Sequence, residues 1–173
     1  MDNARYNGIP NIVQHRTRRY ATTAPFLNIN DLRATFRPDQ FYAKRVWLLS
    51  RGDPSMPWHT WRFANGNPQW WTAYNRVKHA RFDNADRAKL GIVVHAMKAL
   101  FLTLVQSLEF RARLVERGVI RSRGLSVAQL IAIAADWEPL PTQNVVVAVS
   151  DLFGYKFLSQ GSPAQATDTS DFL

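Results

Sequence analysis

The chain has 173 residues, of which 46% are hydrophobic and 12% aromatic, and its formal net charge is +9. This length and composition predict a folded domain with a buried core and exclude a disordered chain. The absence of cysteine excludes disulfide bonds and thiolate metal sites. The first residues lack the apolar core of a signal peptide, and the longest apolar run, residues 91–105, is interrupted by His95 and Lys98. We therefore expect a cytoplasmic protein that does not enter a membrane.

The charge is distributed unevenly along the chain. Every lysine and arginine except Lys156 lies before Gly124, whereas acidic residues dominate after it. A basic body with a mildly acidic end indicates RNA or another polyanion as a partner. General solubility explains the same charge, so the pattern alone leaves both interpretations open.

Residues 1–30 show little regular pattern. They include a basic run at 14–20, which is either an arm that lies on phosphates or a solvated loop. A short helix is predicted from Asn30 to Phe36, because Pro38 disfavours its continuation.

The next segment predicts a small β-hairpin between residues 44 and 64. Residues 41–49 fit a helix or a strand equally, because their apolar positions do not alternate cleanly. Residues 52–57 contain glycine and two prolines and are expected to form a loop. Residues 58–63 have aromatic side chains with a period of two, which favours a short strand.

Two helices follow. Asn67 and Pro68 are typical of a helix start, with asparagine as the cap and proline at the first helical position, and the helix should reach Phe82. A second, long helix is predicted over residues 83–116, with Gly118 as its stop. Its apolar stripe, which we expect to form the core, consists of Leu90, Val93, Met97, Leu100, Leu104 and Leu108.

The last third predicts one more helix and one ambiguous element. Ser126 should cap a helix that extends to Ala135, and residues 145–149 are either a buried strand or the start of a last helix. The resulting fold class is mainly α, a helical bundle around a long central helix with a small hairpin near residues 44–64. Residues 1–160 would form one domain, and residues 161–173 a polar, disordered tail.

The helix that begins near Pro68 concentrates groups that can act on a phosphodiester. Asn75 and His79 are four residues apart and share a helix face. Histidine can transfer protons near neutral pH, and arginine and lysine stabilise phosphate charge. The candidate catalytic residues are Tyr74, Asn75 and His79, and the candidate nucleic-acid contacts on this helix are Arg76, Lys78 and Arg81. The structural alternative is a hydrogen-bonded Asn75–His79 pair on a helix whose core face is Trp70, Trp71 and Val77.

The segment Trp70-Trp71-x-x-Tyr74-Asn75-x-Val77-Lys78-His79-x-Arg81, followed by a long apolar helix, resembles small bacterial proteins of the HEPN superfamily. The resemblance covers about residues 67–110. It implies a helical bundle, usually dimeric, of the kind found in toxin–antitoxin, antiviral defence and CRISPR-associated systems. Active members of the superfamily cleave RNA without metal. Their motif is an arginine, then a polar residue, then a histidine after a short spacer, and two such motifs meet across the dimer.

Carried over residue by residue, this motif is incomplete in the chain. Asn75 matches the polar position and His79 the histidine, but Tyr74 stands where the arginine is expected. The resemblance therefore implies an RNA-binding homodimer, with a protein partner in a defence system and with ribonuclease activity that is weak or lost. Two alternatives remain, namely a non-catalytic HEPN-like module for dimerisation or protein docking, and a basic structural protein of the phage type.

Beyond this motif, the chain has one dense arginine cluster. The cluster comprises five arginines in thirteen residues, and these are Arg111, Arg113, Arg117, Arg121 and Arg123. They form either a phosphate-contacting patch or a set of cations that stabilise the end of the long helix through its dipole. The four histidines lack zinc spacing, and glycine-rich phosphate loops are absent, so we expect no metal and no cofactor.

Overall fold

The computed structural model describes residues 42–63, 66–136, 145–157 and 172. They belong to two compact units. The sheet unit contains residues 45–55 and the described residues from 101 onward, and the helical unit contains residues 42–44 and 56–100. The predicted basic arm and the short helix before Pro38 lie outside the described residues.

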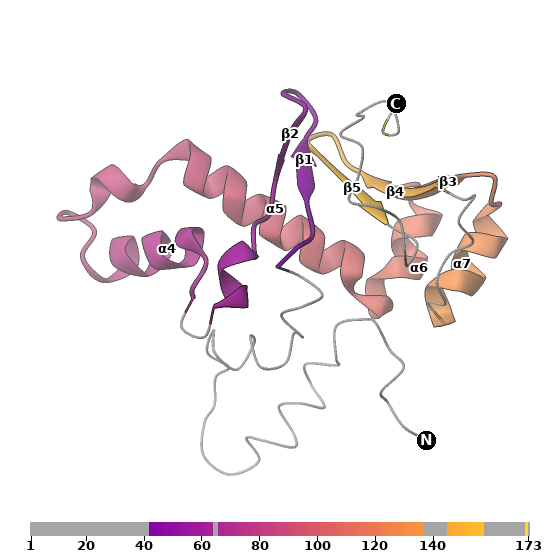
Figure 1. Cartoon of the computed structure of the whole chain (residues 1–173), viewed down its shortest axis with the longest axis horizontal. Helices are drawn as coiled ribbons and strands as arrows, with labels where there is room; N and C mark the ends of the chain where they lie inside the picture. The colour runs from indigo at the N-terminus through magenta and orange to yellow at the C-terminus, as the bar shows by residue number, and fades with distance from the viewer. Residues whose placement is uncertain (1–41, 64–65, 137–144, 158–171, 173) are drawn as a thin grey trace, which may run out of the picture. The chain divides into compact units, whose positions relative to one another are not determined.

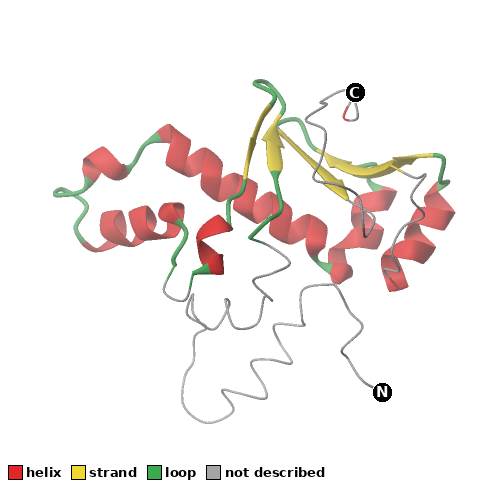
Figure 2. Ribbon diagram, in the orientation of Figure 1, coloured by secondary structure: helices red, strands yellow, loops and turns green. Residues whose placement is uncertain are grey.

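The sheet unit is built on a five-stranded antiparallel sheet in the order β2-β1-β5-β4-β3 (Figures 1 and 2). The strands are β1 Val46–Leu48, β2 Asp53–Ser55, β3 Ile120–Arg123, β4 Val145–Val149 and β5 Phe153–Phe157. The β1–β2 hairpin turns at Gly52, whose φ of 62° is accessible to glycine at little cost. The β4–β5 hairpin is closed by Ser150, whose hydroxyl accepts the N–H of Phe153 at 3.0 Å. Because β5 also pairs with β1, the two hairpins form one sheet.

The expectation of a helical bundle is therefore wrong. The predicted hairpin is present, but its second strand, β2, lies in the segment expected to be a loop. Residues His59–Arg62 form a 3-10 helix, η2, and not a strand. Residues 145–149 form a strand, which resolves the ambiguity of that segment. The strands have only three to five residues, which is too short for the alternation of apolar and polar residues to identify them. The strand β4 is a continuous apolar run and therefore shows no alternation at all.

Two helices of the sheet unit, α6 Leu108–Glu116 and α7 Val127–Asp136, pack against each other and contact β3. Gly118 ends α6 as predicted, with a φ of 70° and its N–H donated to the Val115 carbonyl at 2.9 Å. Ser126 caps α7 in a reciprocal arrangement. The Ser126 N–H donates to Gln129 Oε1 at 2.9 Å, and the Gln129 N–H donates to Ser126 Oγ at 3.3 Å.

The long helix predicted over residues 83–116 is interrupted. It consists of a 3-10 turn, η3 Ala85–Arg87, the helix α5 Leu90–Gln106 and then α6. The break lies at Ser107, whose backbone is extended, and the side chain of Arg111 satisfies the carbonyls exposed there. Arg111 Nη2 donates to the Gln106 carbonyl at 3.1 Å, and its Nε to the Val105 carbonyl at 3.3 Å. Arg111 thus acts as a C-terminal cap of α5.

The apolar stripe of α5 faces the opposite way from our expectation. Its described members are partly to largely exposed, with Leu90 78%, Val93 50%, Met97 42%, Leu100 59% and Leu104 38% accessible. The buried face of the helix contains Lys98, Ala99, Leu102, Val105 and Gln106. Periodicity identified an apolar stripe but could not show which stripe meets the core, because α5 is apolar on almost every side. In the described part of the chain, no single helix is long and apolar enough to cross a bilayer. The helix α5 and residues Phe110–Glu116 of α6 reach that length and hydropathy only together, and the chain bends by 96° between them.

Phe172 is buried, with 3% of its surface exposed, in a small core with Trp47 and Val147. Phe172 belongs to the segment 161–173, which was predicted to be a polar, disordered tail. The other residues of the predicted tail, 161–171 and 173, lie outside the described part of the chain.

Candidate functional site

The helical unit holds the residues of the HEPN-like motif on the helix α4 Gln69–His79. An aromatic cluster fixes its first turn. Trp70 donates its indole N–H to the Pro57 carbonyl at 3.2 Å, and its ring meets Trp58 edge-on at 5.2 Å between centroids. Trp58 in turn packs on Trp61 at 4.1 Å. The helix begins one residue later than predicted, after Pro68, without a side-chain cap from Asn67, and it ends at His79 and not at Phe82.

Helical spacing divides α4 into three stripes with different surroundings. The packing stripe contains Trp70, Ala73 and Val77, which are half-buried or buried. The aromatic stripe contains Trp71, Tyr74 and Lys78. The polar stripe contains Thr72, Asn75, Arg76 and His79, of which Asn75 is half-buried and the others are exposed. The structure thus places Asn75 and His79 on one accessible face, as the sequence indicated.

Tyr74 lies on the aromatic stripe and not beside His79. Its ring is 5.8 Å from that of Trp71, and the Lys78 ammonium is 5.9 Å from its centre. Half of its surface is exposed, at 52%. It is therefore a surface tyrosine in contact with a cation, and it supplies no positive charge of its own to the polar stripe.

The last turn of α4 is basic, with Arg76, Lys78 and His79. Cations at this end stabilise the helix because it carries the negative end of the dipole. Arg81 follows in the next turn and is exposed. The basic cluster therefore has a structural role that is independent of any ligand, and the same side chains remain accessible to an anion.

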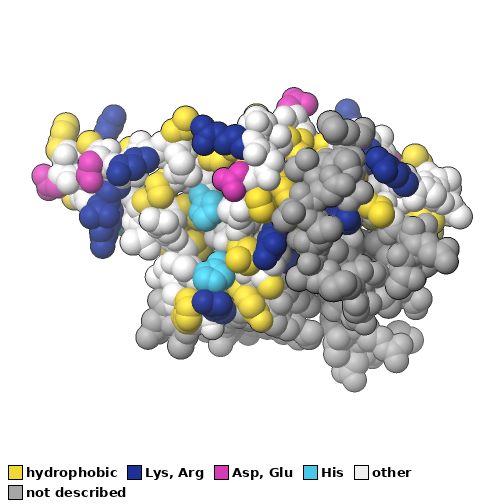
Figure 3. All heavy atoms as spheres, turned by 45° about the horizontal axis from the view of Figure 1, so that its top comes forward, with side chains coloured by type: hydrophobic (Ala, Val, Ile, Leu, Met, Phe, Trp, Pro, Cys, Tyr) yellow, Lys and Arg dark blue, Asp and Glu magenta, His cyan; other side chains and the backbone are white. Residues whose placement is uncertain are grey.

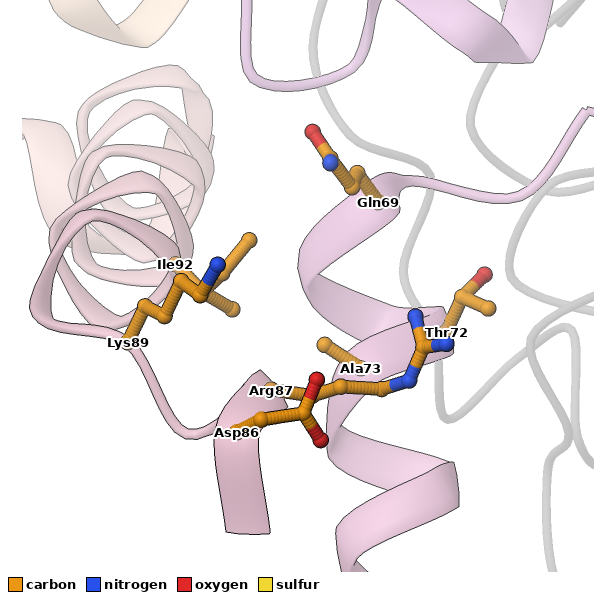
Figure 4. Close-up of a pocket in the computed structure, with 7 residues that line it drawn as sticks. All are labelled: Gln69, Thr72, Ala73, Asp86, Arg87, Lys89 and Ile92. Atoms are coloured by element: carbon orange, nitrogen blue, oxygen red, sulfur yellow. The ribbon is translucent and has the colours of Figure 1, made fainter. Parts of the chain in front are cut away.

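A polar pocket opens between α4, η3 and the start of α5 (Figure 4). Its volume is about 160 Å³, and it is lined by Gln69, Thr72, Ala73, Asp86, Arg87, Lys89 and Ile92. In Figure 4, Arg87 extends from η3 toward Thr72 of α4, while Lys89 and Gln69 lie on opposite sides of the opening. The guanidinium, the ammonium, a hydroxyl and an amide can all donate to an anion. Asp86 contributes the opposite charge at the pocket wall.

A larger apolar groove of about 400 Å³ adjoins this pocket. It is lined by Trp70, Trp71, Ala73, Tyr74, Val77, Arg87, Ala88, Ile92, Val93 and Ala96. The groove and the pocket share Ala73, Arg87 and Ile92, so a cation stands where the aromatic surface meets the polar one. A ligand with a flat apolar part and an anionic part would match this order of surfaces.

The arginine cluster at 111–123 belongs to the sheet unit and does not form one surface. Arg111 is completely buried, with 0% of its surface exposed, so it cannot contact RNA as predicted. Burial lowers its pKa to about 10, an effect that the nearby Tyr155 opposes, and the guanidinium stays charged at neutral pH. Four arginines are exposed, Arg113 and Arg117 in α6 and its cap, and Arg121 and Arg123 on β3. On the face shown in Figure 3, lysines and arginines lie in several separate groups with few acidic side chains between them.

Sequence reasoning missed the residues that line the polar pocket. Arg87 and Lys89 flank the start of the apolar helix and were read as part of a continuous helix. The sequence did offer a signal for this pocket. Thr72 precedes His79 by seven residues, so both residues lie on the polar stripe of α4. Because the helix breaks at η3, Arg87 and Lys89 can approach that stripe.

Among the described residues, no three histidine, aspartate or glutamate side chains are arranged to hold a metal ion. No protein-family model, curated protein or solved structure matches the chain.

Proposed function

We propose that the chain binds single-stranded RNA through the helical unit, and that this unit is a HEPN-like module whose cleavage activity is weak or lost. The observation that carries the proposal is the order of surfaces around α4. The polar stripe of α4, which includes Arg76 and His79, begins at Thr72, and Thr72 lines the polar pocket. The aromatic groove adjoins that pocket.

These surfaces suit the two parts of a nucleotide. Arg87 and Lys89 can neutralise a phosphate, and Trp71 and Tyr74 offer aromatic faces on which bases stack. Stacking tolerates any base, so the expected binding has little sequence preference. The HEPN resemblance covers residues 67–110, and these contain α4, η3 and α5 but none of the strands. The sheet contradicts the helical bundle that the resemblance implied, so the resemblance is proposed only for the segment that contains these helices.

Cleavage would need His79 to move a proton between the 2′-hydroxyl or leaving oxygen and solvent while a cation stabilises the phosphate. Arg76 shares the polar stripe with His79 and can supply that charge. The tyrosine at the motif's arginine position lies on another stripe, and this supports weak activity at most.

The binding proposal is tested by neutralising Arg87 and Lys89 to glutamine in the full chain. Anisotropy of a labelled single-stranded RNA of about ten nucleotides should show weaker binding. The slope of log affinity against log salt is negative, and its magnitude should decrease by about 1.4, since each contact to a phosphate of a single strand contributes about 0.7. The control is Arg51→Gln with Arg62→Gln, which removes the same charge from exposed positions outside the pocket. Equal losses in both variants would show that only net charge matters.

A second candidate is a non-catalytic module that dimerises or docks on a protein partner, as expected for a defence or toxin–antitoxin system. The observation in its favour is the exposed stripe of α5, in which Leu90, Val93, Met97 and Leu100 follow each other at spacings of three and four residues. Such a stripe is the seam that pairs two helices. The stripe and the polar face of α4 involve different residues, but Val93 belongs to the stripe and also lines the aromatic groove, so the two candidate surfaces meet there.

A further inference from the structure

The sheet of the sheet unit has two apolar faces, and the helices that the structure describes cover only one of them. The register of β5 places Phe153, Tyr155 and Phe157 on the inner face. There Phe153 packs on Phe101 at 5.8 Å, and Phe157 lies below the Arg111 guanidinium at 5.9 Å. The same register places Gly154 on the outer face together with its neighbours Trp47 on β1 and Val149 on β4. This outer face needs a cover of its own.

Phe172 supplies that cover. Its ring lies 5.4 Å from that of Trp47, and together with Val147 the two rings form a core surrounded by Leu49, Val145 and Val149. Gly154 forms the floor of the cradle, because a Cβ atom there would lie 2.9 Å from two carbons of the Phe172 ring. Arg121 of β3 donates from Nη2 to the Phe172 carbonyl. The cradle thus consists of Trp47, Val147 and Gly154 around one aromatic ring, with Arg121 as a donor to the backbone that carries the ring.

The rim of this face is basic. The register aligns Lys156 of β5 with Val147 and Arg121, and Arg123 lies two residues along on the same face of β3. The chain that precedes Phe172 contains Asp168 and Asp171 and no lysine or arginine after Lys156. The charge of this segment is therefore opposite to the charge of the rim.

We propose that the outer face of the sheet is a binding site for an aromatic residue carried by an acidic peptide, and that Phe172 of the same chain is its resident ligand. Among the described residues, the contact consists of one aromatic ring and one bond to a backbone carbonyl. Fourteen residues separate Phe157 from Phe172. A tether of this length gives an effective concentration on the order of millimolar, so a free peptide competes only when the resident ring is removed.

The test uses the full chain with Phe172→Ala, which empties the cradle and keeps the rest of the sequence. The probe is a fluorescent peptide with the sequence of residues 166–173. At concentrations of about 50 μM it should bind this variant and not the parent, because the parent's own ring competes at about millimolar effective concentration. A peptide with alanine in place of its phenylalanine should not bind, and one with both aspartates changed to asparagine should bind more weakly.

Two further variants, each made in the Phe172→Ala chain, locate the site. Gly154→Ala should abolish peptide binding by filling the cradle floor, and Arg121→Gln should weaken it about tenfold through loss of a charged hydrogen bond. Arg113→Gln on α6 is the matched control and should leave peptide binding as it is in the Phe172→Ala chain. Circular dichroism confirms that each variant is folded.

Three results would overturn the proposal. The first is a folded Phe172→Ala chain that does not bind the peptide. The second is a parent that binds it equally well. The third is a parent dimer that becomes a monomer with Phe172→Ala, because the ring would then occupy the cradle of a second copy. None of these results depends on RNA binding.

Discussion

At the scale of single residues, His79 decides whether the helical unit has a catalytic function. The side chain is exposed at the end of α4, so His79→Ala should leave the melting temperature unchanged. If the chain cleaves RNA, the activity of the same variant should fall about 10²–10⁴-fold, as expected for the loss of a general acid–base. The assay is cleavage of a labelled RNA in the presence of EDTA. A stability loss of about 1–3 kcal/mol with no activity to lose would instead identify a structural pair with Asn75.

Tyr74→Arg complements that experiment. Because Tyr74 is half exposed, arginine should be tolerated there, contrary to what a core tyrosine would allow. The change restores the cation expected at this position of the HEPN motif. A gain of EDTA-resistant cleavage that disappears again with His79→Ala would support the motif, whereas a folded variant without any gain would count against it.

His95 gives a prediction about pH. Burial, and next the charge of Lys98, lower its pKa below the ordinary value of 6.5. The folded chain therefore binds the proton less well than the unfolded chain. The contribution of His95 to stability is complete above about pH 6.5 and is lost as the pH falls toward its folded pKa. Chemical denaturation from about pH 7 to pH 5 should show a smaller decline for His95→Gln than for the parent. An unchanged decline would assign the pH dependence to other groups.

At the scale of elements, the helix ends that are marked by capping residues could be predicted from the sequence. The Ser126–Gln129 cap and Gly118 fix helix ends through local hydrogen bonds, and both were readable. The break at Ser107 was not readable, because it depends on the buried side chain of Arg111 and on two carbonyls that precede it. The pairing of β5 with β1 joins segments about a hundred residues apart, and no local pattern specifies such a contact.

The exposed stripe of α5 predicts a homodimer. A lysine at Leu100 would place a charge in the centre of the paired stripe, so Leu100→Lys should convert a dimer into a monomer. The side chain is largely exposed within one chain, so the fold itself should tolerate the change. Light scattering measures the mass. Leu152→Lys, at an apolar position in the sheet unit with similar exposure, is the control and should keep the parent's mass. If the parent chain is a monomer, the homodimer prediction is wrong, and the stripe would instead be a surface for another protein.

At the scale of the whole molecule, the net charge of +9 attracts any polyanion, and the question is which cations contact it. The polar stripe of α4 belongs to the helical unit and the exposed arginines of α6 and β3 to the sheet unit, so the candidate contacts are divided between two folded parts. In the sequence, the arginines at 111–123 form one dense cluster, which is either a phosphate-contacting patch or a set of cations at a helix end. The sequence could not show that Arg111 is buried or that Arg121 donates to the Phe172 carbonyl.

Two of the three remaining exposed arginines of that cluster, Arg113 and Arg117, can be tested separately. Arg113→Gln with Arg117→Gln removes two cations from α6 and its cap without touching the pocket or the cradle. If both contact phosphates, the salt slope of RNA binding should fall by about 1.4, and affinity should decline alike for all sequences. Anisotropy titrations from about 50 to 200 mM salt measure this slope. Combining the pair with Arg87→Gln and Lys89→Gln should lower it by about 2.8, because contacts on different units contribute independently. A slope that stays at the parent's value in the Arg113/Arg117 variant would restrict the RNA-binding surface to the helical unit.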